Sequence, residues 1–199
     1  MASDDHPPGL RERKKIRTRE TIRVQALKLF EANGYAATTV EQIAQAADVS
    51  PSTFFRYFAN KEALLIPDQL MDPIIDAFIN APPELSPVAA YRLAVGHMFT
   101  GISSTEWEPE RARQKLMYTL PEARGALYNQ YIDTIEQIKA ALAIRLRLRA
   151  DDPRLRTTAG AITGVIMASL HGAPMDPDDI NRALEFLDAG LPFPKDADG

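Results

Sequence analysis

Apolar residues recur at helical spacing along most of this chain. No stretch alternates apolar and polar residues over the length of a strand, whereas spacings of three and four residues recur throughout. The first predicted helix, about 10–32, has an apolar stripe at i, i+4, i+7 and i+8, formed by Ile22, Ala26, Leu29 and Phe30. The pattern therefore predicts an all-α protein.

Capping residues divide the helical pattern into segments. The first helix should end at Gly34, because glycine accepts the backbone conformation that a helix C-cap needs. Thr38 or Thr39 can cap a second helix. Ser50 can cap a third, with Pro51 at the first helical position, where a missing N–H costs nothing.

Prolines organise the rest of the chain. A fourth helix should run from Lys61 to about Ile79 and be kinked or divided at Pro67. The two ends, 1–10 and 191–199, are polar or proline-rich and are expected to be flexible tails. Further helices are expected at about 86–102, 108–118, 121–149, 153–171 and 177–189.

The second and third predicted helices, Val40–Ala47 and Pro51–Tyr57, are short and joined by a tight turn. Such a pair is typical of a helix-turn-helix, whose second helix enters the major groove of DNA while the first braces the backbone. Because so short a helix needs tertiary support, Phe54 and Phe58, four residues apart, are expected to pack inward. The other side of the helix then carries Ser52, Thr53, Phe55, Arg56 and Tyr57.

The residue types on that outer side suit a nucleic acid. Arg56 can donate two hydrogen bonds to guanine O6 and N7, the Tyr57 hydroxyl can bond a phosphate, and Phe55 can meet a thymine methyl. Lys61 can bind a phosphate at the start of the fourth predicted helix. The alternatives are a small core that contains all the aromatic side chains, and ordinary surface charges.

Positive charge concentrates near the N-terminus. The chain of 199 residues has a formal net charge of −4, but Arg11 to Lys61 contains ten Lys or Arg and only five Asp or Glu. This division indicates a polyanion partner for one part of the protein. Within the run RERKKIRTR, Arg13, Lys14 and Arg17 can reach flanking phosphates or a minor groove. A solvated face and adsorption to a membrane surface are the alternatives.

Several protein classes are disfavoured by what the sequence lacks. It has no cysteine and only three scattered histidines, so we expect no disulfide framework, no metal site and no cofactor. No apolar run approaches the roughly 20 residues of a membrane span. The N-terminus carries no apolar signal segment, so we expect a cytoplasmic protein with no membrane partner. No G-x-S-x-G, H-E-x-x-H or P-loop motif points to an enzyme.

Residues 18–65 read TRETIRVQALKLFEANGYAATTVEQIAQAADVSPSTFFRYFANKEALL. The stretch at about 11–66 resembles the DNA-binding domain of the TetR family of bacterial transcription regulators. The shared features are A-L-x-L-F-x-x-x-G-Y, T-T-V-x-x-I-A, the V-S turn, the aromatic third helix and N-K-E-x-L-L. The resemblance implies an all-α homodimer with an N-terminal helix-turn-helix domain, 11–62, and a larger effector-binding and dimerisation domain, 63–190.

The resemblance also implies which residues contact DNA. Many members of the family have tyrosine where this chain has Phe55, so a hydroxyl–phosphate bond is not expected there. The implied contact residues are Thr39, Val40, Ser50, Pro51, Ser52, Thr53, Phe55, Arg56, Tyr57 and Lys61.

The C-terminal two thirds offer candidates for an effector cavity and a dimer interface. Methionine and aromatic side chains suit an adaptable apolar cavity. The cavity candidates are Tyr91, Val95, Met98, Phe99, Ile102, Trp107, Met117, Tyr118, Tyr128 and Met167. In similar proteins the last two long helices pair with their copies, and the interface candidates are Gly160, Gly164, Ala168, Ile180, Ala183, Leu184 and Leu187. Packing inside the monomer core is the alternative for both sets.

These observations lead to one hypothesis and two alternatives. We expect a homodimer that represses transcription by binding a pseudo-palindromic operator in double-stranded DNA. An apolar or amphipathic small-molecule effector would release it by favouring another conformation. The alternatives are a helical adaptor with a degenerate helix-turn-helix, and a small helical enzyme that uses the C-terminal cavity.

Overall fold

The computed structural model describes residues 9–66, 71–100, 108–171 and 176–192. Within these ranges every regular element is a helix, so the all-α prediction is confirmed. The chain divides into two compact units, Met1–Leu64 and Leu65–Gly199, which we call the N-terminal and C-terminal units. The sequence analysis places this boundary between residues 62 and 63.

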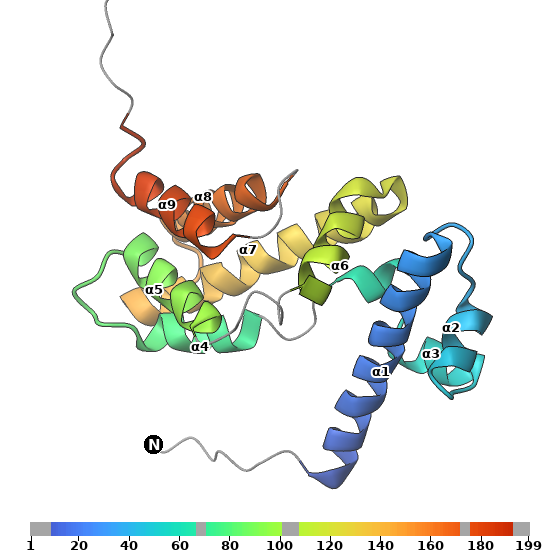
Figure 1. Cartoon of the computed structure of the whole chain (residues 1–199). Coiled ribbons are helices and arrows are strands. Elements are labelled where there is room, and N and C mark those ends of the chain that lie inside the picture. Colours follow the sequence, from blue (N-terminus) through green and yellow to red (C-terminus); the bar gives the residue numbers. More distant parts are fainter. Residues whose placement is uncertain (1–8, 67–70, 101–107, 172–175, 193–199) are drawn as a thin grey trace, which may run out of the picture. The chain divides into compact units, whose positions relative to one another are not determined.

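The N-terminal unit contains one long helix and two short ones: α1 (Leu10–Asn33), α2 (Val40–Ala46) and α3 (Pro51–Tyr57) (Figure 1). Helix α1 is followed by Gly34 as its C-cap, and the φ of 82° at this position favours glycine. Helix α2 begins with a capping box, in which Thr39 Oγ1 accepts from the backbone N–H of Gln42 (3.2 Å) and Gln42 Oε1 accepts from the backbone N–H of Thr39 (2.8 Å). Ser50 Oγ caps α3 by accepting from the backbone N–H of Thr53 (3.0 Å).

Buried side chains from all three helices form the core of the N-terminal unit. Phe54 and Phe58 are buried, with ring centroids 5.7 Å apart, so their predicted inward orientation is confirmed. The guanidinium of Arg19 lies 4.4 Å from the ring centroid of Phe58, and its Nη1 donates to the carbonyl oxygen of Tyr57 (2.6 Å). Helices α1 and α2 add Ile22, Ala26, Phe30, Ile43 and Ala44.

The fourth predicted helix is not continuous. Asn60 Oδ1 accepts from the backbone N–H of Ala63 (2.9 Å), as a cap should, but the element that follows is the short 3₁₀ helix η1 (Glu62–Leu65). Pro67, which lies outside the described residues, has no N–H for the carbonyl of Ala63 and disfavours the α conformation at Ile66. The α-helical conformation expected from Lys61 is therefore wrong, whereas the predicted division of this helix is confirmed, since a separate helix begins at Met71.

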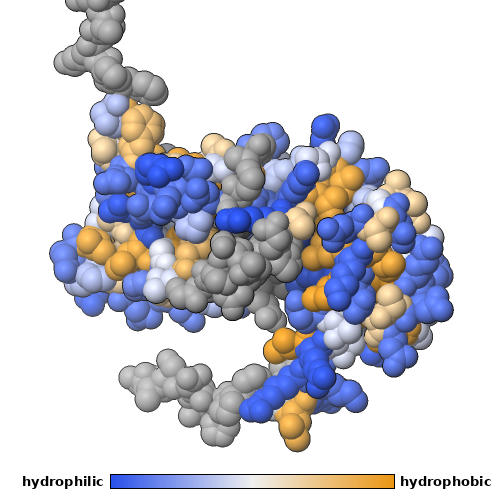
Figure 2. Space-filling model, viewed as in Figure 1, coloured by the Kyte–Doolittle hydropathy of each residue, from blue (hydrophilic) through white to orange (hydrophobic). Residues whose placement is uncertain are grey.

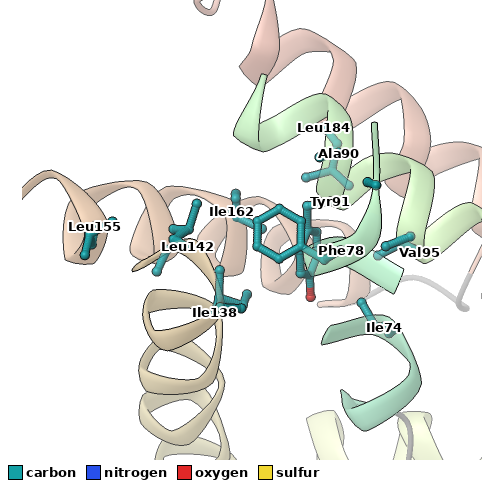
Figure 3. Close-up of a cluster of buried hydrophobic side chains, with 14 of the residues drawn as sticks. Ile74, Phe78, Ala90, Tyr91, Val95, Ile138, Leu142, Leu155, Ile162 and Leu184 are labelled. Carbon is teal, nitrogen blue, oxygen red and sulfur yellow. The ribbon is translucent and has the colours of Figure 1, made fainter. Parts of the chain in front are cut away.

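The C-terminal unit contains α4 (Met71–Asn80), α5 (Pro87–Phe99), α6 (Glu108–Thr119), η2 (Pro121–Ala123), α7 (Arg124–Leu146), α8 (Pro153–Leu170) and α9 (Pro177–Asp188). Figure 3 shows part of its buried cluster, in which the rings of Phe78 and Tyr91 meet edge to face with centroids 5.5 Å apart. Ile138, Leu142 and Leu184 lie in the same cluster. No helix in the described ranges combines the length and apolarity that crossing a membrane requires.

The long helix predicted over 121–149 is shorter than expected. It begins as η2 and ends at Leu146, because Arg147 adopts a left-handed conformation with φ of 53°. The N–H of Leu148 then bonds to the carbonyl of Ala143 (3.1 Å), and the Leu148 side chain packs on the core. This is the hydrogen-bond pattern of a Schellman C-cap, with its hydrophobic contact.

Arg145 holds the connection between α4 and α5 in place. Its two terminal nitrogens donate to four backbone carbonyls in the last turn of α4 and in the connection that follows. The shortest bonds, both 2.6 Å, go to Ala81 and Pro82, and longer ones go to Phe78 and Leu85. One cation on α7 thereby orders the turn that positions α5.

Candidate nucleic-acid interface and ligand cavity

Helix α3 presents a mixed polar and aromatic face to solvent. With Phe54 buried, its neighbour Phe55 is 55% exposed, and Pro51, Ser52 and Arg56 are exposed as well. Thr53 and Tyr57 are half-buried along the edge of this face. Phe54 points inward and Phe55 points outward because adjacent residues of a helix project about 100° apart.

Arg56 and Tyr57 support each other on the outer face of α3. The guanidinium carbon of Arg56 lies 5.3 Å from the centroid of the Tyr57 ring. This cation–π contact limits the conformations of an exposed arginine. The N–H groups of the Arg56 guanidinium therefore project from a short helix, and buried phenyl rings fix the position of that helix.

The basic start of α1 and the turn between α2 and α3 line one concave surface. Arg13, Lys14 and Arg17 are exposed, and Figure 2 shows mainly hydrophilic residues on this part of α1, with a few apolar ones among them. A hollow in the N-terminal unit is lined by these three residues and by Thr18, Thr21, Ala47, Asp48 and Val49. Three predicted phosphate contacts therefore lie beside the helix-turn-helix turn.

The residues at the start of α2 are less available for contact with DNA than the outer face of α3. Thr39 is exposed, but its hydroxyl oxygen is the N-cap acceptor described above. Val40 is half-buried. Thr39 still has a hydroxyl hydrogen to donate, so a bond to a phosphate remains compatible with its role as a cap.

Lys61 is held inside the N-terminal unit rather than at a helix N-terminus. Its Nζ donates to the carbonyl oxygens of Tyr35 (2.7 Å) and Thr38 (3.0 Å) and lies 4.0 Å from the centroid of the Tyr35 ring. The argument from a helix dipole fails, because η1 is a four-residue 3₁₀ helix. The phosphate contact of Lys61 stays a prediction, with one ammonium N–H left for it.

Replacement of Lys61 by methionine should destabilise the N-terminal unit by about 1–3 kcal/mol, because two carbonyls would lose charged donors. Urea unfolding of the full chain, with amide hydrogen exchange of α1 to α3, measures the loss. Lys28→Met, at an exposed position on α1, is the control and should change little. Equal stabilities for the two variants would contradict the structural role of Lys61.

The C-terminal unit encloses a cavity of about 150 Å³. Its wall is mainly apolar, with contributions from α4 to α9, which suits a small organic ligand. Seven residues proposed from the sequence line it: Tyr91, Val95, Met98, Phe99, Met117, Tyr118 and Met167. Ile102 and Trp107 lie outside the described residues.

Tyr128 was placed wrongly. It is 64% exposed and does not line the cavity. The face of α7 that does so carries Leu127, Gln130, Tyr131 and Thr134, at i, i+3, i+4 and i+7. Tyr128 lies one position after Leu127 and therefore projects from a different face of α7. Which face of α7 turns toward the cavity depends on the neighbouring helices.

The sequence analysis missed the polar part of the cavity wall. Arg113 and Gln114, both on α6, are buried and line the cavity. Gln114 Nε2 donates to the carbonyl oxygen of Leu170 on α8 (2.9 Å). The signal was the spacing of Arg113 and Gln114 four residues before Met117 and Tyr118, two of the proposed lining residues.

Burial affects the ionisation of the cavity tyrosines. Desolvation raises the pKa of Tyr91, and it also raises the pKa of Tyr118, against the opposing effect of the positive charge on Arg113. Both hydroxyls therefore stay protonated at neutral pH. Within the described residues, no three His, Cys, Asp or Glu side chains come together as metal ligands.

The candidate dimer interface needs correction. Ile180 and Leu184 are buried inside the C-terminal unit, and Ile180 lines the cavity, so these two side chains cannot meet a second copy. A Cβ on Gly164 would lie 3.7 Å from the hydroxyl of Tyr131, so Gly164 faces α7. The apolar stripe of α9 is instead part of the monomer core.

The rest of the proposed interface lies nearer the surface. Ala168 is exposed, and Gly160, Ala183 and Leu187 are half-buried. A Cβ on Gly160 would meet open space. These four positions remain compatible with contact to a second copy, which stays a prediction.

Two families of known proteins match this chain. Residues 22–66 match the family described as bacterial regulatory proteins, tetR family. Residues 85–192 match the family described as the MftR C-terminal domain. The first match contains α2 and α3, and the second contains α5 to α9.

Curated relatives are similar over much of the chain. The HTH-type transcriptional regulator TcmR of Streptomyces glaucescens is 38% identical over 147 residues, which are 71% of this chain and 64% of TcmR. MftR of Mycobacterium tuberculosis, named for regulation of mycofactocin biosynthesis, is 26% identical over 189 residues, which are 90% of this chain and 93% of MftR. The match thus spans less than two thirds of the length of TcmR.

Solved structures share the fold. A SmeT–triclosan complex has a TM-score of 0.57 at 23% identity and covers 92% of this chain and 97% of SmeT. Thermus thermophilus FadR, a TetR-family transcriptional repressor in complex with lauroyl-CoA, has a TM-score of 0.55 at 23% identity. That match covers 91% of this chain and 98% of FadR.

Proposed function

This chain belongs to the TetR family of bacterial transcription regulators, and on that premise we propose that it is a repressor whose dimer binds a pseudo-palindromic operator until a small molecule releases it. The observation that carries the proposal is the outer face of α3. Phe54 and Phe58 are buried, whereas Phe55 and Arg56 face solvent on the same helix. An exposed phenyl ring beside an arginine fits a groove that offers both methyl groups and hydrogen-bond acceptors.

Base reading and phosphate binding are divided between different elements. Arg56 reads guanine, Phe55 meets a thymine methyl, and Ser50, Pro51, Ser52, Thr53 and Tyr57 surround them along α3. Arg13, Lys14 and Arg17 of α1, which line the hollow beside the turn, bind flanking phosphates. Thr39 and Val40 meet the DNA backbone at the start of α2. Lys61 contributes chiefly through the fold of this unit.

The effector enters the cavity of the C-terminal unit. Its largely apolar wall, with methionines from α4, α5, α6 and α8, adapts to an apolar or amphipathic molecule. The effector acts by binding more tightly to the conformation in which the two α3 helices of the dimer do not match the operator half-sites. Relief of repression then follows from its differential affinity for the two states.

Dimerisation is part of the proposal because one α3 reads only one half-site. We assign the contact to the outer sides of α8 and α9, with Gly160, Ala168, Ala183 and Leu187 as the remaining candidates. The protein acts in the cytoplasm as a DNA-binding regulator and not as an enzyme. An adaptor without DNA binding is the competing function, and exposed Arg56 argues against it.

Selection of random DNA fragments by the purified full chain tests the proposal. The expected product is one family of sequences with two inverted half-sites about 34–36 Å apart. A band-shift titration of the selected site over a range of salt concentrations then gives the affinity and the number of phosphate contacts. Recovery of unrelated fragments with equal affinity would favour the adaptor instead.

Arg56→Ala should weaken binding to the selected operator by about 1–3 kcal/mol and relax base preference at one position in each half-site. The reason is the loss of two hydrogen bonds to one base edge. Band shifts on the operator and on single-base variants measure both effects.

Arg17→Ala is the matched control, since it removes the same charge at a proposed phosphate contact. It should weaken binding to every sequence equally and lower the slope of affinity against salt by about one. If Arg56→Ala behaved in this second way, base reading by Arg56 would be wrong.

A further inference from the structure

The turn between α2 and α3 carries an acidic residue beside the proposed phosphate contacts. Asp48 is exposed and lines the same hollow as Arg13, Lys14 and Arg17 of α1. In the described lining of that hollow, Asp48 is the one acidic side chain. A negative charge therefore lies on the surface where the proposed function places DNA phosphates.

The backbone at Asp48 has a conformation that favours glycine. Its φ is 54°, in the left-handed region, where a side chain costs free energy that glycine avoids. The N–H of Asp48 donates to the carbonyl oxygen of Gln45 (3.1 Å). The N–H of Val49 donates to the carbonyl oxygen of Ala44 (2.9 Å), which completes the Schellman pattern that ends α2. The fold of this turn alone would thus be better served by glycine at position 48.

The side chain of Asp48 does not offset this cost through contacts inside the protein. Among the residues that the structure describes, its carboxylate has no hydrogen bond and no ion pair. Asp152 and Asp176 differ in this respect, because their side chains accept from backbone N–H groups and cap α8 and α9. The carboxylate of Asp48 therefore acts on what lies outside the N-terminal unit.

We propose that Asp48 repels DNA phosphates and thereby limits the affinity of this protein for DNA of any sequence. The inference rests on the proposed DNA-binding function of α1 and α3. Because the carboxylate and the three cations of α1 border one hollow, a phosphate bound there approaches both. Repulsion by the carboxylate then offsets part of the attraction by the cations.

A limit on affinity suits a repressor that a small molecule must release. Phosphate contacts need no particular sequence, so additional positive charge would hold the protein on DNA whether or not α3 fits the groove. An effector releases the protein only by its differential affinity for two conformations. Weaker phosphate binding lowers the differential affinity that is needed, so Asp48 keeps the operator complex within the reach of an effector.

Asp48→Asn in the full-length protein should bind DNA about 3- to 10-fold more tightly in about 0.1 M salt. The substitution removes the charge and keeps a side chain that tolerates the left-handed conformation. Band shifts should show the same gain for the selected operator and for a random duplex of equal length. The gain should become smaller as salt is raised to about 0.3 M, because screening shortens the range of the repulsion.

Glu31→Gln is the matched control, since it removes an equal charge from an exposed position on α1. It lies about 15 Å along the helix axis from Thr21, the last residue of α1 in the lining of the hollow. The affinity for either duplex should change by less than about twofold. A gain equal to that of Asp48→Asn would mean that only the net charge of the protein matters, against the proposed role of this position.

Asp48→Gly separates the charge from the backbone. It should tighten DNA binding to the same extent as Asp48→Asn. It should also raise the urea concentration at which the N-terminal unit unfolds, because glycine adopts a positive φ without strain. If Asp48→Gly tightened binding and Asp48→Asn did not, the backbone and not the charge would limit the affinity, and the inference would be wrong.

Other results would also overturn the inference. Unchanged or weaker binding of Asp48→Asn to both duplexes would exclude repulsion. A loss confined to the operator would show that the carboxylate accepts a hydrogen bond from a base, as acidic side chains do from cytosine. If the unaltered protein binds no DNA, the proposed function fails together with this inference. Equal binding of the operator by the unaltered protein and Asp48→Asn contradicts this inference alone.

Discussion

Replacing Phe54 by alanine is expected to lower the free energy of unfolding of the N-terminal unit by about 3–5 kcal/mol. The ring is fully buried between α3 and the rest of the core and contacts the rings of Phe55 and Phe58. The N-terminal unit is small, so a loss of this size is comparable with its whole stability. Operator binding should disappear with it. Amide hydrogen exchange of α1 to α3 and band shifts measure the two effects.

Phe55→Ala supplies a control one residue away. Its ring is 55% exposed, and its loss should cost at most about 1 kcal/mol through the edge contact with Phe54. Operator affinity should nevertheless fall, because Phe55 lies on the proposed reading face. A variant pair with equal losses of stability would show that α3 is not anchored as described.

Leu184→Ala should destabilise the C-terminal unit by about 2–5 kcal/mol, and by the same amount at every protein concentration. Leu184 is fully buried in the monomer cluster with Tyr91 and Ile162, so its removal leaves a hole in the core and not in an interface. Urea unfolding followed by circular dichroism, repeated over a wide range of protein concentration, measures both the loss and its dependence on association.

Asn181→Ala is the matched control on the same helix. Asn181 is exposed, and the substitution should change stability by less than about 0.5 kcal/mol. A loss for Leu184→Ala that grows on dilution would place this residue in the dimer contact, as the sequence analysis first expected, because association stabilises the folded state by mass action.

The elements of the N-terminal unit could be predicted closely because their signals are local. Thr39 and Ser50 cap α2 and α3 with side chains that reach only three residues along the chain. The spacing of Phe54 and Phe58 identifies one face of a single helix turn. The same local signals predicted the starts of α5, α8 and α9, each at a proline that follows a capping residue.

The candidate site was only partly predictable. Seven lining residues of the cavity could be named because methionine and aromatic side chains concentrate in internal cavities. Arg113 and Gln114 could not, since charged and amide side chains are usually exposed. Their burial depends on Leu65 and Leu170, which are distant in the sequence and supply the carbonyl acceptors.

By itself, the sequence determined that this protein is helical, where most helices begin and which face of α3 is anchored. The reason is that caps and helical periodicity act within one or two turns. The tertiary structure decided what each apolar face packs against, so that Ile180 and Leu184 of α9 belong to the monomer core. It also decided which polar groups lie inside, because Lys61 and Arg113 find their acceptors only after distant segments have packed together.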